Sequence, residues 1–264
     1  MTIRGRVKRW LYGSCPGFAG SFPYFGTRVY FPTRSIIFDA ACQQGIYEQP
    51  NLRAILSFLR DGSHVLDVGA NIGLMSVPVL ASNSGVKLVS YEPSPDTLRF
   101  LARTRQGSAF ADRWEVVGKA VGAAPGISKF SLGPVELGVF DSLKSTGRAA
   151  VSRVVDVDVT TIDAEWHRLG RPDVSVIKID VEGAEYEVLQ GATECIDRCR
   201  PAVVAEWSPL NIGAYGRSLD ELLMVAEQLR YRIWALPHLA EIRDPTGLRV
   251  QASVTESFLL VAGP

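Results

Sequence analysis

A charged motif at the end of one apolar segment is the first candidate for chemistry. The segment "VSVIKIDVEGAE" spans residues 174–185 and carries Lys178, Asp180 and Glu182 at every second position. Side chains alternate along a strand, so Lys178 and Asp180 share one side of it. At the carboxyl end of a strand in a parallel α/β sheet, Asp180 would face the crevice where ligands bind. A carboxylate there can orient a substrate hydroxyl or take its proton.

We therefore predict three catalytic residues in this motif. Asp180 comes first, as general base or as the group that orients the hydroxyl. Glu182 comes second, and Lys178 either pairs with one of these acids or contacts the acceptor. Structural alternatives stay open, because Lys178 and Asp180 could form a buried ion pair and Glu182 could cap the next helix. Glu185 begins that helix, where the helix dipole favours a carboxylate without any functional role.

A glycine-containing turn is the second candidate site. The stretch "LDVGANIGLMS" carries Asp67, Gly69, Asn71 and Gly73 between an expected strand and an expected helix. Glycines at such a turn let backbone N–H groups approach a ligand closely. Glu92 ends the next apolar segment, where a carboxylate can accept both hydroxyls of a ribose. The turn and Glu92 together predict a nucleoside cofactor.

The sequence of the turn favours S-adenosylmethionine over NAD, although both contain such a ribose. The dinucleotide fingerprint G-x-G-x-x-G is absent, and Asp67 would repel a pyrophosphate. The ammonium and sulfonium groups of S-adenosylmethionine are cationic, so the same carboxylate would attract them. The methionine carboxylate could bind at the helix N-terminus after Gly73.

An alternation of apolar segments and amphipathic helices predicts the fold class. Strands rich in Val, Ile and Leu without polar alternation are typical of a parallel sheet buried on both faces. We expect a doubly wound, Rossmann-like α/β fold with a seven-stranded, mostly parallel sheet and an antiparallel C-terminal strand, with no helix between the last two strands. The main strands are expected at 64–69, 87–92, 114–121, 174–181, 201–207, 231–236 and 254–263. The helices are expected at 51–60, 72–82, 94–105, 164–170, 185–196 and 218–230.

Composition limits the partners and the compartment. Lys plus Arg equals Asp plus Glu at 28 each, so no global charge points to a nucleic acid or an acidic membrane. Cys15, Cys42, Cys195 and Cys199 lack paired C-x-x-C spacing and are expected to be reduced thiols in the cytoplasm. No apolar run approaches about 18 residues, so we expect no transmembrane helix.

The N-terminal 50 residues differ from the rest and are expected to form an extension or lid, followed by one domain at 51–264. The start, "MTIRGRVKRWLYG", is basic and aromatic. It could cover the substrate or contact a membrane peripherally, but a partly ordered arm is the favoured interpretation.

Six motifs, in this order, resemble the FkbM family of S-adenosylmethionine-dependent methyltransferases over residues 60–210. They are "VLDVGANIGLMS", "SYEPSP", "GKAVG", "TTID", "VIKIDVEGAEYEVLQGA" and "PAVVAEW", of which "KIDVEGAE" is the most specific. The resemblance implies the class I methyltransferase fold and O-methylation of a hydroxyl on a saccharide or polyketide-type metabolite. It also implies that Asp67, Gly69, Gly73 and Glu92 are cofactor positions and that Ala120 lies near the adenine.

We therefore expect an S-adenosylmethionine-dependent O-methyltransferase that acts on a small-molecule or lipid-linked hydroxylated acceptor. Two alternatives are a catalytically silent cofactor-binding scaffold and, less favoured, a nicotinamide-dependent oxidoreductase. We predict no metal ion. A divalent ion held by Asp180, Glu182 and Glu206 is the alternative, but no cluster of His or Asp residues requires one. Acceptor contacts are expected from 1–50, 132–145 and 208–217.

Overall fold

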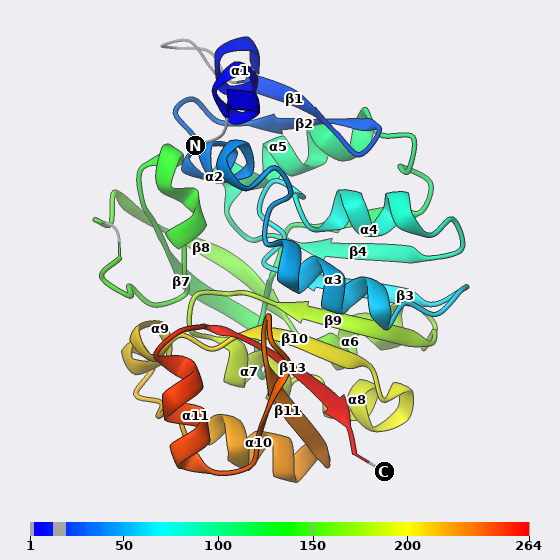
Figure 1. The fold of residues 1–264 in the computed structure, drawn as a ribbon, viewed down its shortest axis with the longest axis vertical. Helices are drawn as coiled ribbons and strands as arrows, with labels where there is room; N and C mark the ends of the chain where they lie inside the picture. The colour runs from blue at the N-terminus through cyan, green and yellow to red at the C-terminus, as the bar shows by residue number, and fades with distance from the viewer. Residues whose placement is uncertain (1–2, 13–19, 149, 264) are drawn as a thin grey trace.

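A central eight-stranded sheet organises the chain in the computed structural model, which describes residues 3–12, 20–148 and 150–263 (Figure 1). Its strand order is β12-β11-β13-β10-β9-β3-β4-β5. The strands are β3 (His64–Val68), β4 (Lys87–Tyr91), β5 (Trp114–Val117), β9 (Val174–Ile179), β10 (Ala202–Glu206), β11 (Tyr231–Ala235), β12 (Ala240–Ile242) and β13 (Ser257–Ala262). β13 is antiparallel to both of its neighbours, whereas β10, β9, β3, β4 and β5 pair in parallel.

Helices bury both faces of this sheet, as the continuous apolar strands require. Adjacent strand residues belong to different hydrophobic clusters, Val176 to one and Ile177 to the other. The first cluster is covered by α3 (Gln49–Ser57), α4 (Ser76–Ser82) and α5 (Pro95–Gln106). The second is covered by α6 (Ile162–Arg168), α7 (Glu185–Gln190), α8 (Thr193–Cys199) and α10 (Glu221–Leu229). The prediction of a doubly wound α/β fold is confirmed.

The C-terminal part differs from the prediction in two respects: β12 adds an eighth strand to the expected seven, and a helix precedes the last strand. β11 and β13 are antiparallel neighbours, as expected, but β12 and the helix α11 (Pro245–Ala252) lie between them along the chain. The expectation of no helix there was wrong. Asp244 caps α11 by accepting a hydrogen bond from Gly247 N at 2.8 Å, and Pro245 occupies the first turn. Both are local helix-start features that a search for apolar periodicity overlooks.

Residues 20–44 pack against the main domain and include a helix that the sequence did not reveal. The stretch "RVYFPTRSIIFDA" at 28–40 suggests at most two short strands, but only its first part is a strand, β2 (Thr27–Phe31), and its second part belongs to the helix α2 (Ile36–Gln44). β2 pairs with β1 (Gly20–Tyr24), which precedes that stretch. Phe31 stacks on Phe38 of α2 with ring centroids 4.0 Å apart, within the hydrophobic cluster that also holds α4 and α5. The most N-terminal helix, α1 (Ile3–Tyr12), lies beyond them at the upper end of Figure 1.

A second, smaller sheet lies beside the central one. Its strands, in spatial order, are β6 (Ala120–Val121), β8 (Arg153–Thr160) and β7 (Gly126–Leu132). The short 3-10 helix η1 (Val135–Phe140) follows β7 in the chain. The expected strand at 114–121 therefore divides between the two sheets. The expected helix at 185–196 divides into α7 and α8 at Gly191, where a Cβ would lie 2.1 Å from the carbonyl oxygen of Gly122. Among the described residues, none of the helices is both long and apolar enough to cross a lipid bilayer.

Candidate active site

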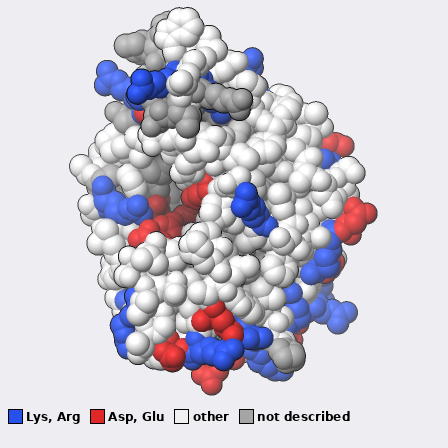
Figure 2. Space-filling view, viewed as in Figure 1, with Lys and Arg blue, Asp and Glu red and all other residues white. Residues whose placement is uncertain are grey.

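A cavity opens at the carboxyl ends of β3, β4 and β9, where ligands bind in doubly wound sheets. The face shown in Figure 2 is hollowed near its centre, and acidic atoms gather in the hollow. Most of the residues predicted from the sequence line the cavity, namely Gly69, Asn71, Glu92, Ala120, Lys178, Asp180 and Glu182. Asp67 and Gly73 belong to the same turn but do not line it. Ile36, Ile37 and Ala40 of α2 also line the cavity.

The glycine turn packs tightly on the end of β9. Gly69 has φ +78°, and a Cβ there would lie 1.7 Å from the carbonyl oxygen of Asp180. Gly69 N and Ala70 N both donate to the carbonyl oxygen of Tyr91 at 3.0 Å. Only glycine satisfies both the positive φ and the close approach, so Gly69 fixes the floor of the cavity against the charged strand end.

Glu92 lies at the end of β4 with both carboxylate oxygens already positioned. They accept hydrogen bonds from Asn71 N and Ser94 N, each at 2.9 Å. Burial nevertheless raises the pKa of Glu92 to about 7, because these two hydrogen bonds only partly offset the loss of hydration. A carboxylate oxygen can accept more than one hydrogen bond, so Glu92 can still receive the hydroxyls of a ribose.

Asp67 faces the interior of the sheet. It is 1 % exposed; its Oδ2 accepts a hydrogen bond from Ser76 Oγ at 2.5 Å, and its Oδ1 lies 3.7 Å from Lys178 Nζ. Burial raises the pKa of Asp67, with Lys178 opposing the shift. The expected direct attraction between Asp67 and a cationic ligand therefore has no geometric support. Asp67 instead positions Lys178 and the helix that follows the turn.

Lys178 connects the turn to the acidic strand end. Its Nζ donates to Gly69 O and to Asp180 Oδ2, both at 3.1 Å, and its side chain is almost completely buried. Burial by itself lowers the pKa of Lys178, but Asp180, Asp67 and Glu48 outweigh that effect and raise it above its ordinary value. Lys178 is therefore a permanent cation between two carboxylates.

Asp180 pairs with Lys178 and also lines the cavity, so the two interpretations of this residue are compatible. Burial by itself raises the pKa of Asp180, but Lys178 and a hydrogen bond from Glu206 hold it below its ordinary value. Glu206 ends β10, and burial next to Asp180 raises the pKa of Glu206 far above its usual range. These opposite shifts favour a negative charge on Asp180 and a proton on Glu206.

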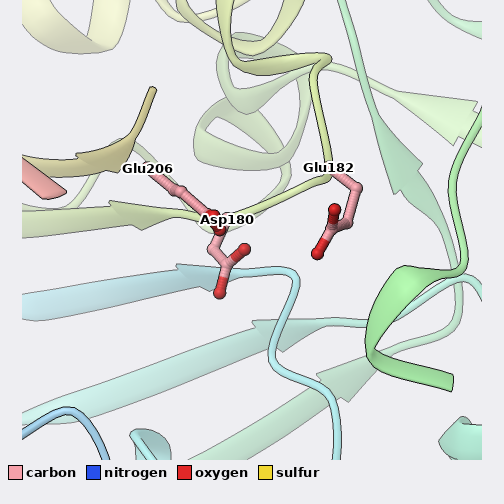
Figure 3. A group of neighbouring side chains, drawn as sticks. All are labelled: Asp180, Glu182 and Glu206. Atoms are coloured by element: carbon pink, nitrogen blue, oxygen red, sulfur yellow. The ribbon is translucent and has the colours of Figure 1, made fainter. Parts of the chain in front are cut away.

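Glu182 completes a group of three carboxyl groups (Figure 3). It lies in the turn after β9 with φ +57°, and its Oε2 accepts from Arg148 at 3.1 Å and from Asn211 Nδ2 at 2.8 Å. Burial and the nearby Asp180 raise the pKa of Glu182 to about 8, although Arg148 opposes the shift. Glu182 therefore changes charge close to neutral pH, as a proton acceptor in a catalytic site would.

These three carboxyl groups could also hold a divalent cation. One oxygen each from Asp180, Glu182 and Glu206 lie within 4.8 Å of one another. Arg148 Nη1 already lies 3.1 Å from Glu182 and 3.8 Å from Glu206, and Lys178 pairs with Asp180, so two basic side chains supply positive charge there. That the site works without a metal stays a prediction.

Glu185 has the structural role that was expected of it. Its Oε1 accepts hydrogen bonds from Val181 N at 3.0 Å and Gly183 N at 3.2 Å, at the start of α7. The carboxylate thus holds the turn that carries Glu182. Gly183 in that turn has φ +109° and packs closely against the carbonyl oxygen of Asn211. A Cβ at position 183 would lie only 2.5 Å from that oxygen.

Several residues of the site were not predicted as such. Arg148 comes from the irregular segment before β8, and Asn211 comes from α9 (Pro209–Ala214), inside the 208–217 segment where acceptor contacts were expected. Glu48, at the start of α3, also lines the cavity; burial raises its pKa, and the coulombic effect of Asp180 adds to the shift.

A second cavity of about 540 Å³ adjoins the acidic group from the other side. It shares Glu48, Lys178, Asp180 and Glu206 with the first cavity. Its other walls are largely polar and come from the start of α3 and the segment before β13, with Asn51, Ser253, Thr255, Glu256 and Ser257. No motif in the sequence marks residues 252–257 as part of a site.

A family comparison decides what this arrangement is. The model of the FkbM methyltransferase domain matches residues 67–233, which include the glycine turn, Glu92 and the whole acidic strand end. The chain belongs to the FkbM methyltransferase family. This FkbM methyltransferase therefore uses S-adenosylmethionine as its cofactor, as the turn sequence predicted, and the nicotinamide alternative is wrong.

Individual proteins of known name or structure are also similar to this chain. The methyltransferase sdnD of Sordaria araneosa is 30 % identical over 182 residues, which make up 56 % of this chain and 68 % of that protein. A ribosomal RNA small subunit methyltransferase G of Mycoplasmopsis pulmonis is 34 % identical over only 64 residues, 24 % of this chain and 27 % of that one. An FkbM methyltransferase structure from Methylobacillus flagellatus has a TM-score of 0.49 at 20 % identity and covers 78 % of this chain and 45 % of its own.

Proposed function

We propose that this FkbM methyltransferase transfers the methyl group to a hydroxyl oxygen of a saccharide or polyketide-type metabolite. The observation that carries the proposal is the ionised Asp180 at the junction of the two cavities, next to Glu182 and Glu206. An acceptor in the second cavity would meet the cofactor in the first at these carboxyl groups. Several hydrogen-bond acceptors around one point suit a hydroxyl, which must be oriented and must lose its proton.

The cofactor position follows from the lining of the first cavity. We place the ribose on Glu92, the backbone of the Gly69–Asn71 turn beside the methionine part, and the adenine near Ala120. When bound, S-adenosylmethionine would supply the methyl group, which is attached to a positively charged sulfonium. After transfer the remaining cofactor is a neutral thioether. Within the N-terminal extension of residues 1–50, α2 is the part that would act as a lid beside the cofactor, because Ile36, Ile37 and Ala40 line the cavity.

Asp180 would accept the hydrogen bond of the acceptor hydroxyl and take its proton as the new C–O bond forms. Its lowered pKa makes it a weak base, so orientation is its larger contribution. Alignment of two reactants can contribute about 7–11 kcal/mol, more than the typical effect of proton removal. Glu182 is the second candidate for the proton, since its pKa of about 8 suits a base near neutral pH.

The acceptor class rests on the lining of the second cavity. Asn51, Ser253, Thr255 and Ser257 offer neutral hydrogen-bond donors and acceptors, which match a methyl acceptor with several hydroxyls.

We place this reaction in the cytoplasm, in keeping with the free thiols of Cys42, Cys195 and Cys199. Cys15 lies outside the described residues.

A comparison of metabolites from cells with and without the gene tests the proposed reaction. We expect one or more hydroxylated metabolites to gain the mass of one CH₂ group only when the gene is present. Cells that carry an Asp180→Asn gene serve as the control, because they produce the folded protein with an impaired site. Accumulation of a methylated amine or thiol in place of a hydroxyl product would contradict the proposal.

Substitution of Glu92 tests the cofactor position. In Glu92→Gln the side-chain NH₂ group replaces one carboxylate oxygen and must face Asn71 N or Ser94 N, which are themselves hydrogen-bond donors. The charge-assisted hydrogen bonds to the ribose are also lost. Hydrogen bonds to charged groups are worth about 1.5–3 kcal/mol, so S-adenosylmethionine affinity in calorimetry should fall about 10–100-fold. The exposed Glu194→Gln should bind normally. Unchanged affinity in Glu92→Gln would show that the ribose lies elsewhere.

A further inference from the structure

The N-terminal helix α1 presents its apolar side chains to solvent. Ile3, Val7, Trp10 and Leu11 are 82 %, 49 %, 83 % and 56 % exposed. Their spacing of i, i+4, i+7 and i+8 places them on one face of the helix. An amphipathic helix of a globular protein normally turns such a face toward the core, so the orientation of α1 is inverted.

Contacts on the opposite face of α1 fix this orientation. Lys8 Nζ lies 4.2 Å from the ring centroid of Phe22, and burial lowers the pKa of Lys8. Tyr12 packs on the hydrophobic cluster of the main domain, and Arg9 forms an ion pair with Asp39 of α2 at 3.0 Å. The helix is therefore anchored through Lys8, Arg9 and Tyr12, and its apolar face is left without a partner within the described residues.

The charge of α1 indicates what would cover this face. The helix sequence "IRGRVKRWLY" contains four basic residues and no acidic residue, whereas the whole chain has no formal net charge. Arg6 is exposed beside the apolar face, and basic side chains stand out at this end of the molecule in Figure 2. A helix with Lys and Arg beside Trp and Leu has the composition of one that lies in the interface of an anionic bilayer.

We propose that α1 binds the surface of an anionic lipid membrane, with Ile3, Val7, Trp10 and Leu11 inserted at the level of the headgroups. Trp favours this interface, and each basic residue near it adds electrostatic attraction to anionic lipid. A second copy of the chain fits less well, because the face of a ten-residue helix is small beside the roughly 800 Å² that each partner of a stable interface buries. Two copies would also bring like charges together.

The inference goes beyond methyl transfer and does not rest on it. α1 packs on α2, which lines part of the cofactor cavity, so a membrane-bound molecule would hold that cavity close to the lipid surface. The helix lies outside the catalytic and binding residues. Variants of its exposed side chains should therefore keep normal S-adenosylmethionine affinity in solution, whatever the acceptor proves to be.

Sedimentation with vesicles tests the proposal. The full chain should bind vesicles that contain phosphatidylglycerol, bind weakly to pure phosphatidylcholine, and lose affinity as salt concentration rises. A Trp10→Ser, Leu11→Ser double variant should bind at least about tenfold more weakly, because two large apolar side chains are removed from the interface. Arg6→Glu should also weaken binding. Ile127→Ser is the matched control, since Ile127 is 74 % exposed on β7, and it should bind like the wild type.

Three outcomes would overturn the proposal. The first is a wild-type protein that does not bind anionic vesicles. The second is a double variant that binds as well as the wild type. The third is a lipid-free wild type that elutes as a dimer while the double variant elutes as a monomer, which would assign the face to self-association. Unchanged thermal unfolding of the double variant would show that a loss of vesicle binding does not reflect misfolding.

Discussion

Asp180→Asn should lower kcat about 10²–10⁴-fold, the typical contribution of a positioned acid or base. The substitution keeps the size of the side chain but removes the negative charge that orients and deprotonates the acceptor hydroxyl. Asp180 is one of three acidic side chains that line both cavities, and Lys178 lowers its pKa. Residual turnover is expected because the cofactor and acceptor remain aligned.

Steady-state kinetics with the methyl acceptor, together with calorimetry of S-adenosylmethionine binding, measures this effect. Cofactor affinity should change little, since Glu92 and the glycine turn are untouched. Asp156→Asn is the matched control, because Asp156 also pairs with a lysine, Lys129 at 2.7 Å, but lies exposed on β8. A kcat near the wild-type value in Asp180→Asn would show that Asp180 neither orients nor deprotonates the acceptor.

Lys178→Met should lower the free energy of unfolding by about 3–5 kcal/mol, the usual cost of breaking a buried ion pair on one side. Without the ammonium group, Asp67 and Asp180 lose the cation that lies 3.7 Å and 3.1 Å from them, and Gly69 O loses its donor. Met fills a similar volume, so most of the loss would come from uncompensated buried charge rather than from a cavity.

Urea unfolding of the protein without ligand measures this effect. Lys129→Met is the control: its pair with Asp156 is exposed, and exposed pairs are worth only about 0–1 kcal/mol. Adding Asp67→Asn to Lys178→Met should recover part of the loss, because one of the two buried charges disappears with its partner. If Lys178→Met proved as stable as Lys129→Met, the lysine would not be the charge that holds this strand end together.

The parts of the site that could be predicted from sequence are those set by local rules. Side chains alternate along residues 174–181, which predicts that Lys178 and Asp180 lie on the same side of the strand. The apolar segment that precedes the glycines predicts the position of the glycine turn. The same alternation explains the position of Asp67. It is still inside β3 on the same side as Val65, so it points to α4 and Ser76 rather than into the cavity.

The remaining features depend on packing between distant segments. Arg148 reaches Glu182 across 34 positions from an irregular loop, and Asn211 reaches it across 29 positions from α9. The helix α2 is short, and Phe38 stacked on Phe31 anchors it to β2. Such contacts leave no period or motif in the chain, because each depends on where the rest of the fold places its partner.

The position of a labelled methyl group in the product shows directly whether the protein methylates a hydroxyl oxygen. The purified protein is incubated with S-adenosylmethionine carrying a ¹³C methyl group and with the acceptor identified in the metabolite comparison, and the product is examined by NMR. We expect the label to appear as a methyl ether on a hydroxyl oxygen, and we expect Asp180→Asn to form the same product far more slowly. A label on nitrogen, sulfur or carbon, or a protein that binds the cofactor without transferring the label, would contradict this expectation.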